Sequence, residues 1–211
     1  MKNVFVLHVD NYRPDLCKFT LPTIRAWADK IGANLRFIQS RKFNGWPITY
    51  EKMQVHELGR GARWNILVDA DFLLHPDLPD FTDMLDRSVV GIHYGFNWRQ
   101  FFKPNPYLER ARHTQAVAGG FVITSDWTHD LWEPLPMTPA QALSQTARPF
   151  IIDEYAMTYN LCKYGLNFTG LQFSEAVSKQ MIHLGSEERT AEQKQQDVIF
   201  AENTVRAWGF E

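Results

Sequence analysis

The sequence has no apolar segment long enough to cross a membrane, although hydrophobic residues make up 45% of its 211 residues. A membrane-spanning helix needs about 18 or more consecutive apolar residues, so we expect no transmembrane segment. The apolar run at the N-terminus, Val4–Val9, is too short for a signal peptide and is typical of a first strand.

Strong net charge and a cysteine framework are also missing. A net charge of -2 provides no general attraction to nucleic acid or anionic membranes, so we expect no nucleic-acid partner. Cys17 and Cys162 are isolated, with neither metal-ligand nor disulfide spacing, which favours a reducing, cytoplasmic setting. Repeats, low-complexity tracts and linkers are absent too. We therefore expect one domain over residues 1–211, a length that supports a continuous core.

The segment Trp64–Leu74 carries the strongest functional signal. Its apolar run predicts a buried strand that ends in two carboxylates, Asp69 and Asp71. Residues i and i+2 of an extended chain point the same way, so both carboxylates are expected to face one spot. Like charges placed so closely repel unless a cation neutralises them, and a hard divalent ion with oxygen ligands does so. The pattern favours a metal-and-phosphate site; the alternative is a pair of solvated turn aspartates.

Strand and helix signals alternate along the chain. Apolar β-branched runs predict strands, and apolar residues spaced three or four apart predict helices. The expected strands cover residues 4–9, 35–38, 66–68, 89–93, 117–123 and 167–171, and the expected helices cover residues 21–31, 49–58, 78–85, 153–164 and 191–208. Pro22 is expected in a first helical turn and Thr49 as a helix cap, and Ser125 is expected to cap a helix containing Trp127 and Leu131. This order predicts an α/β fold with right-handed crossovers and a largely parallel sheet.

One long connection, Tyr94–His113, contains glycine, two prolines and several aromatic rings. Loops of that length are usually functional or mobile, so we expect it to be mobile without substrate and to close over it as a lid. Four rings are expected in loops, where they either stack on a ligand or belong to local core: Trp46, Trp98, Phe101 and Phe102.

Four further motifs accompany Val68-Asp69-Ala70-Asp71 in chain order: Lys52 or Arg63 before the acidic strand, Ala118-Gly119-Gly120-Phe121, Asp153-Glu154, and Ile182-His183-Leu184-Gly185. Together they resemble a GT-A glycosyltransferase, nearest to the glycogenin and bacterial galactosyltransferase-like group. The resemblance implies a single Rossmann-like nucleotide-binding domain with a mostly parallel central sheet and flanking helices. It also implies metal-dependent transfer of a sugar from a nucleotide-diphosphate sugar, in the first place a UDP-sugar, to an acceptor hydroxyl.

The resemblance assigns roles to individual residues. Asp71 and His183 would bind Mn²⁺ or Mg²⁺, and Asp69 would bind the same ion or the ribose. Asp153 and Glu154 would supply a general base in an inverting enzyme, or in a retaining one would orient the acceptor or stabilise positive charge on the sugar. The local alternatives are a hydrogen-bonded loop histidine at 183 and a helix N-cap at Asp153.

The donor nucleotide is expected at the end of the first strand. There the polar side chains His8, Asp10, Asn11 and Tyr12 offer hydrogen bonds and one ring for stacking, unless they form only a polar turn. Lys52 is also expected at the donor site. Gly119 and Gly120 either let the backbone approach the donor closely or form a bulge.

The sequence departs from the family at one point. Related enzymes place a diphosphate-binding lysine after His-x-x-Gly, whereas this chain reads Ser186-Glu-Glu-Arg189. Either Arg189, Lys179 or Arg13 replaces that lysine, or His183 is not the counterpart. Two other functions remain open: a haloacid-dehalogenase-like phosphatase, which also uses Asp-x-Asp, and a catalytically silent carbohydrate- or nucleotide-binding domain of the same fold.

Overall fold

The computed structural model describes residues 1–111, 113–171, 177, 179–185 and 189–210. Its strands are β1 (Lys2–Leu7), β2 (Asn34–Ile38), β3 (Trp64–Asp69), β4 (Phe72–Leu74), β5 (Val89–Ile92), β6 (Gly95–Asn97), β7 (Gln115–Val117), β8 (Phe121–Ser125), β9 (Asn167–Gly170) and β10 (Met181–His183). Its α-helices are α1 (Pro14–Lys30), α2 (Val55–Leu58), α3 (Pro106–Arg110), α4 (Pro139–Leu143), α5 (Ile152–Lys163) and α7 (Ala191–Ala207). Within the described residues, no helix is both long and apolar enough to cross a membrane.

A six-stranded sheet in the order β2-β1-β3-β8-β5-β9 forms the centre of the molecule. All neighbouring strands are parallel except β8, which is antiparallel to both β3 and β5. In the β1–β3 register Leu7 lies beside Asp69. The end of the first strand and the acidic motif therefore meet at one edge of the sheet, as the mostly parallel α/β prediction requires.

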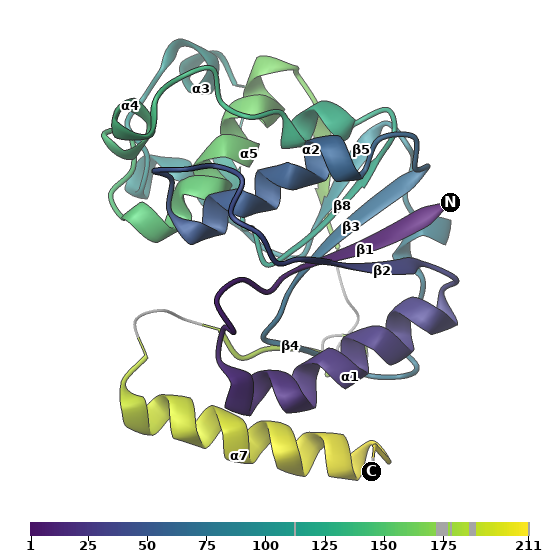
Figure 1. The fold of residues 1–211 in the computed structure, drawn as a ribbon. Helices are drawn as coiled ribbons and strands as arrows, with labels where there is room; N and C mark the ends of the chain where they lie inside the picture. Colours follow the sequence, from purple (N-terminus) through teal and green to yellow (C-terminus); the bar gives the residue numbers. More distant parts are fainter. Residues whose placement is uncertain (112, 172–176, 178, 186–188, 211) are drawn as a thin grey trace.

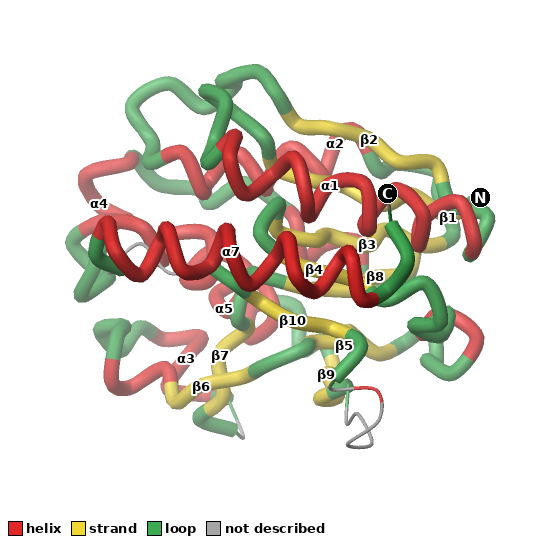
Figure 2. The backbone as a smooth tube through the Cα atoms, turned by 90° about the horizontal axis from the view of Figure 1, so that it is seen from below, coloured by secondary structure: helices red, strands yellow, loops and turns green. Residues whose placement is uncertain are grey.

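The side chains of the central strands alternate between two hydrophobic cores, one on each face of the sheet. Val4, Val6 and Ile66 pack into the core on one face, whereas Phe5 and Leu67 pack into the core on the other. Successive side chains of a strand point to opposite faces, so a strand buried on both sides reads as one continuous apolar run. Helix α1 covers one face and α5 the other, and α7 runs alongside α1 (Figures 1 and 2).

Helix α1 begins seven residues before the expected start at Leu21. Pro14 occupies the first turn, where a missing N–H costs nothing, and Pro22 lies inside the helix. Burial of Leu16 and Cys17 stabilises the additional turns despite the internal proline. The prediction that Pro22 lies in the first turn was therefore wrong.

The expected helix over residues 49–58 is mostly a 3₁₀ helix, Ile48–Gln54, which continues as α2 and ends at Gly59. Thr49 does not cap it, because its hydroxyl donates to the carbonyl of Phe150 at 3.0 Å. The expected helix over residues 78–85 is only a 3₁₀ turn, Phe81–Asp83, with Asp80 as its cap. Ser125 also caps no helix: it ends β8, and its hydroxyl accepts from the backbone N–H of Trp127 at 2.9 Å.

The segment Tyr94–His113 is not the structureless loop that its composition predicted. It contains β6, a 3₁₀ turn at Trp98–Gln100 and α3, and β6 pairs with β7. Trp98 and Phe102 are 3% and 4% exposed and belong to the core on the α5 face. Burial of these rings gives the segment its structure, so the length-based argument for a mobile lid no longer holds.

Candidate active site

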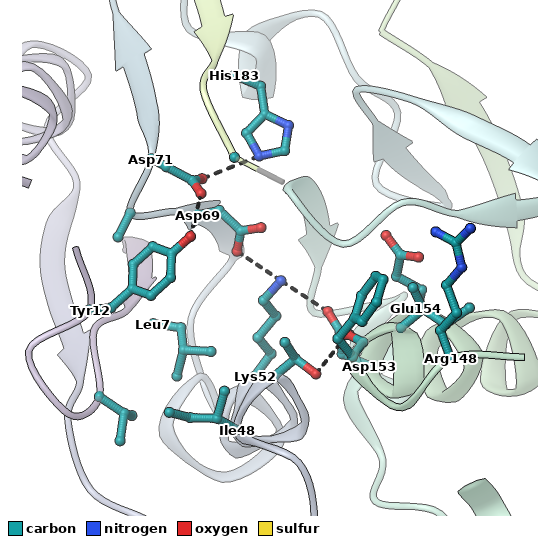
Figure 3. Close-up of a pocket in the computed structure, with 16 residues that line it drawn as sticks. Leu7, Tyr12, Ile48, Lys52, Asp69, Asp71, Arg148, Asp153, Glu154 and His183 are labelled. Carbon is teal, nitrogen blue, oxygen red and sulfur yellow. Dashed lines mark hydrogen bonds and ion pairs between the residues drawn. The ribbon is translucent and has the colours of Figure 1, made fainter. Parts of the chain in front are cut away.

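A cavity of about 310 Å³ lies at the sheet edge where β1 and β3 end (Figure 3). Open α/β sheets usually bind ligands at this carboxyl edge. The residues around it come from distant parts of the chain: Leu7, Val9, Tyr12, Ile48, Thr49, Lys52, Asp69, Ala70, Asp71, Arg148, Phe150, Ile151, Asp153, Glu154, His183 and Gly185. They include most of the residues expected in the site.

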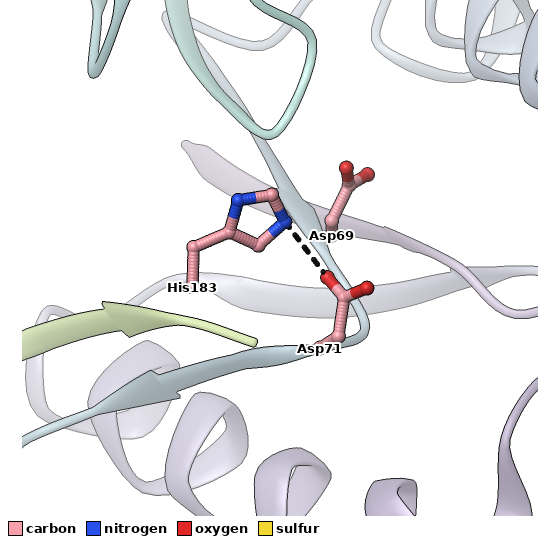
Figure 4. A group of neighbouring side chains, drawn as sticks. All are labelled: Asp69, Asp71 and His183. Atoms are coloured by element: carbon pink, nitrogen blue, oxygen red, sulfur yellow. Dashed lines mark ion pairs between the residues drawn. The ribbon is translucent and has the colours of Figure 1, made fainter. Parts of the chain in front are cut away.

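The strands β3, β4 and β10 bring the expected metal ligands together. Asp69 ends β3, and β4 follows it after a short turn and pairs antiparallel with β10 so that His183 lies opposite Phe72. The imidazole stacks on the Phe72 ring, with 4.4 Å between ring centroids. One ligand atom from each of Asp69, Asp71 and His183 falls within 4.8 Å of the others (Figure 4).

The surroundings of Asp71 fit a bound cation. Its carboxylate is almost fully buried, and Oδ1 has no hydrogen-bond partner among the described residues, although Nε2 of His183 lies 3.2 Å away. A Cβ atom on Gly185 would lie only 2.2 Å from Oδ2, so the backbone there leaves the carboxylate just enough room. A buried carboxylate oxygen without a partner is costly. Two carboxylates and one imidazole suit Mn²⁺, and the carboxylates alone suit Mg²⁺.

The two aspartates have opposite electrostatic environments. Burial raises the pKa of Asp69 to about 6, despite the nearby ammonium of Lys52. Burial also acts to raise the pKa of Asp71, but His183 and the hydroxyl of Tyr12 together hold that pKa below its ordinary value. Of these two aspartates Asp71 therefore stays ionised more readily, as a direct metal ligand must.

Tyr12 is the one member of the expected nucleotide-binding group at the end of the first strand that lines the cavity. Its hydroxyl donates to Oδ2 of Asp71 at 2.9 Å. Burial, reinforced by the charge of Asp71, raises the pKa of Tyr12 well above its usual value, so the phenol keeps its proton. His8, Asp10 and Asn11 are not among the cavity-lining side chains.

Lys52, buried on the 3₁₀ helix, connects the two sides of the cavity. Its Nζ lies 2.8 Å from Asp69 and 2.9 Å from Asp153, and it donates to the carbonyl of Gly119 at 3.1 Å. Burial acts to lower its pKa, but the charges of Asp153 and Asp69 raise it, so the group remains an ammonium. Arg63 was the alternative to Lys52 as the basic residue before the acidic strand. It lies directly before β3, at the end of that strand opposite Asp69, and its backbone N–H donates to the carbonyl of Met1.

Asp153 and Glu154 enter the cavity from the first turn of α5. Asp153 is not an N-cap: the cap position is Ile151, and the Asp153 carboxylate pairs with Lys52 instead. Oε1 of Glu154 accepts from the backbone N–H of Gly119 at 3.1 Å. Burial and the adjacent charge of Asp153 raise the pKa of Glu154 to about 8, so this carboxyl exchanges a proton near neutral pH.

The two glycines between β7 and β8 make room for side chains of the protein itself. A Cβ on Gly119 would lie 2.5 Å from the Asp153 carboxylate, and one on Gly120 would lie 3.1 Å from the Phe72 ring. The backbone at these glycines therefore closely approaches side chains of the protein itself, Asp153 and Phe72, where the sequence predicted a close approach to the donor.

No known protein family matches the chain at the sequence level, and no curated protein matches it. Solved structures do. A glycosyltransferase involved in glycosylation of the major capsid of PBCV-1 has a TM-score of 0.56 and 9% identity, covering 96% of this chain and 98% of that one. The bifunctional glycosyltransferase WbbM has a TM-score of 0.58 and 15% identity, covering 94% of this chain and 49% of that one.

The galactosyltransferase LgtC, solved with donor and acceptor sugar analogs, has a TM-score of 0.50 and 12% identity over 99% of this chain and 100% of that one. The chain has the GT-A glycosyltransferase fold. At such low identities the likeness shows the fold and not the substrate. Within the GT-A fold, the Asp-x-Asp pair lies where the sequence predicted it, at the end of a central strand.

The residues proposed to replace the diphosphate lysine of the GT-A resemblance are otherwise engaged or lie outside the cavity. Arg13 pairs with Asp197 of α7 at 2.9 Å, and Arg189 pairs with the same carboxylate. Lys179 does not line the cavity. The residues Ser186–Glu188, at which the sequence differs from the family pattern, lie outside the described part of the chain.

Sequence reasoning missed the cation that lines the GT-A cavity on the α5 side, Arg148. Its guanidinium carbon lies 5.7 Å from the ring centroid of Phe101 and 5.8 Å from that of Phe150. No local pattern marked this arginine, because it lies in a proline-rich connection, although Asp153 follows only five residues later.

The aromatic rings expected in loops pack on protein. Trp46 is stacked on Tyr50 with centroids 3.7 Å apart. Trp98 and Phe102 belong to the core on the α5 face, and Phe101 packs against that core. No described residue of the segment from Tyr94 to His113 lines the cavity. The structure thus assigns these rings to packing and not to the cavity wall.

Proposed function

We propose that this chain is a metal-dependent glycosyltransferase that moves a hexose from a nucleotide-diphosphate sugar, in the first place a UDP-sugar, to an acceptor hydroxyl. The observation that carries the proposal is the grouping of Asp69, Asp71 and His183 within 4.8 Å at the carboxyl edge of a GT-A sheet. The buried Oδ1 of Asp71, which has no hydrogen bond among the described residues and lies 3.2 Å from Nε2 of His183, supports an ion at that point. Solved structures of the same fold include one determined with donor and acceptor sugar analogs.

Asp71, Asp69 and His183 would hold Mn²⁺ or Mg²⁺. When bound, the ion would neutralise the charge that develops on the departing diphosphate. Lys52 keeps Asp69 and Asp153 in place and compensates part of their charge without an ion from solution. The cavity walls at Leu7, Val9 and Ile48 would exclude water beside the donor.

Glu154 is the better placed of the two proposed catalytic carboxylates. Lys52 already binds Oδ2 of Asp153, whereas Glu154 accepts a hydrogen bond from the neutral Gly119 N–H and has a pKa raised to about 8. In an inverting reaction Glu154 would accept the proton of the acceptor hydroxyl as its oxygen bonds to the anomeric carbon. The bond from that carbon to the phosphate oxygen breaks, and the nucleoside diphosphate leaves with its electron pair.

The test combines binding with turnover. Calorimetry should find that UDP binds more tightly with Mn²⁺ than with EDTA, and the purified protein with Mn²⁺ should slowly release UDP from a UDP-sugar. Equal UDP affinity with Mn²⁺ and with EDTA would remove the metal from the proposal. Binding of UDP-sugar without any release of UDP, across a panel of acceptors, would favour a silent binding domain.

A phosphatase would instead cleave a simple phosphate ester and ignore nucleotide sugars. We consider this function less well supported, because the solved structures described above are glycosyltransferases. The single-domain organisation over residues 1–211 and the cytoplasmic setting stay predictions from the sequence.

A further inference from the structure

The loop between β1 and α1 has an unusual backbone. Asp10, Asn11 and Arg13 all adopt positive φ angles, of 55°, 53° and 39°. Non-glycine residues rarely occupy this left-handed region, and they stay there only where surrounding contacts hold them. Tyr12 lies within this run, so the same contacts determine where its side chain points.

Contacts on both sides fix this loop. Arg13 donates to the carbonyl of Leu184 at 3.1 Å and to the Asp197 carboxylate at 2.9 Å, and Sγ of Cys17 donates to the carbonyl of Tyr12 at 3.0 Å. Leu184 follows directly after β10, and its N–H donates to the backbone carbonyl of Asp71 at 2.9 Å. The loop, the end of β10 and the acidic motif are therefore joined through direct hydrogen bonds.

Within this framework the phenol of Tyr12 makes a hydrogen bond to only one of the two oxygens of Asp71. Oδ2 accepts the Tyr12 hydroxyl at 2.9 Å, whereas Oδ1 lies on the His183 side at 3.2 Å from Nε2 and has no hydrogen bond among the described residues (Figure 3). A carboxylate held by one oxygen cannot rotate freely. Its second oxygen is then presented to the point that the three proposed ligands surround.

We propose that Tyr12 is a positioning residue of the metal site, whose hydroxyl orients the Asp71 carboxylate so that Oδ1 is directed at the ion. Residues that hold metal ligands by hydrogen bonds typically change metal affinity about 10- to 100-fold when they are removed. This inference rests on the proposed metal-dependent function. It adds a role for Tyr12 that base stacking does not require, because stacking needs the ring and not the hydroxyl.

The experiment measures Mn²⁺ binding without nucleotide, by the EPR signal of the free ion, in wild type, Tyr12→Phe and Tyr164→Phe. The Tyr12→Phe variant keeps the ring and loses only the hydroxyl. Tyr164 provides the matched control, because its phenol also donates to a carboxylate, that of Glu133, but outside the cavity. We expect Tyr12→Phe to bind Mn²⁺ about tenfold more weakly and Tyr164→Phe to bind it as wild type does.

Thermal unfolding in EDTA shows whether both variants are folded at the temperature of the measurement. Loss of the fold is thereby separated from loss of affinity in a folded protein. Equal or tighter Mn²⁺ binding by folded Tyr12→Phe would overturn the positioning role while leaving the metal site intact. Absence of Mn²⁺ binding by wild type would instead overturn the proposed metal-dependent function itself.

Discussion

The cavity has two acidic sides that compensate their charge in different ways. On the metal wall, formed by Asp69, Asp71 and His183, the Asp71 oxygen nearest the histidine has no hydrogen bond among the described residues. On the helix wall, formed by Asp153 and Glu154, the charge of Asp153 is met by Lys52 at 2.9 Å. Lys52 thus compensates Asp153 on the helix wall and, at 2.8 Å, Asp69 on the metal wall, whereas Asp71 faces His183 and, under the proposed function, an ion from solution.

This difference explains how four carboxylates fit into one cavity. Buried like charges raise each other's pKa unless a cation lies close by. Lys52 contacts one carboxylate of each wall, and Glu154 reduces the remaining repulsion by taking up a proton more readily than usual. Each element of this arrangement can be removed singly, so the two walls can be tested apart.

The largest effect is expected when the shared cation is removed. Lys52→Met keeps most of the side-chain length but leaves Asp69 and Asp153 without their partner. Loss of one partner from a buried ion pair costs about 3–5 kcal/mol, and we expect a decrease of that size in the free energy of unfolding measured with urea in EDTA. Adding Asp153→Asn should restore part of the loss. A decrease below about 1 kcal/mol would mean that the ion pairs of Lys52 with Asp69 and Asp153 are exposed to solvent.

Asp71→Ala should affect the metal wall alone. We expect Mn²⁺ affinity to fall at least about a hundredfold, since loss of an outer partner alone can cost that much, while the fold persists because repulsion with Asp69 is relieved. Calorimetric titration with Mn²⁺ provides the measurement. The exposed carboxylate of Asp83 offers the control, and Asp83→Ala should titrate as wild type does. Retention of wild-type Mn²⁺ affinity in Asp71→Ala would place the ion elsewhere.

His183→Ala should lower the Mn²⁺ affinity of the metal wall less than Asp71→Ala does. One of three proposed ligands disappears and both carboxylates remain, so we expect Mn²⁺ affinity to fall by about tenfold and the Mg²⁺ affinity to change less, because Mg²⁺ prefers oxygen ligands. His75, which lies beyond β4 and outside the cavity, serves as the control. An equal loss of affinity for both ions would indicate that the imidazole supports Asp71 without being a ligand.

The last effect concerns the helix wall and depends on pH. A carboxyl whose pKa is higher in the folded protein stabilises the fold in its protonated form, so that contribution is lost as the pH rises from about 4.5 to about 8. Glu154→Gln removes the titration, and its stability relative to wild type should therefore increase between these pH values, by about 1.4 kcal/mol for each pKa unit by which folding raises the value. Denaturation in EDTA at both ends of the range provides the test, with Glu202→Gln on the surface of α7 as the control. A constant difference would contradict the raised pKa.

Local patterns predicted much of the fold. The apolar runs at β1, β2 and β3 and the helical spacing in α5 and α7 appear in the structure close to their expected positions. The errors occurred where tertiary packing overrides local preference. Burial of Leu16 extended α1 past an internal proline, and burial of Trp98 and Phe102 ordered a segment whose glycine and prolines predicted a loop.

The candidate site divides in the same way. The spacing of Asp69 and Asp71 marked one wall of the cavity, and family resemblance indicated the residues Asp153, Glu154 and His183. Neither predicted that Lys52 bridges the two walls, that Tyr12 binds Asp71, or that Arg148 enters from the α5 side. Such contacts join residues far apart in the chain, 59 positions in the case of Tyr12 and Asp71, and the sequence contains no local signal for them.

The sequence by itself determined the alternation of strands and helices and the position of the carboxylate pair at a strand end, because side-chain periodicity and burial act over a few residues. Only the tertiary structure decided which charges meet. Pairing of β4 with β10 brings His183 to Asp71, and packing of the 3₁₀ helix against α5 brings Lys52 to Asp153. The energy of such an ion pair depends on distance and burial, and both are properties of the folded chain.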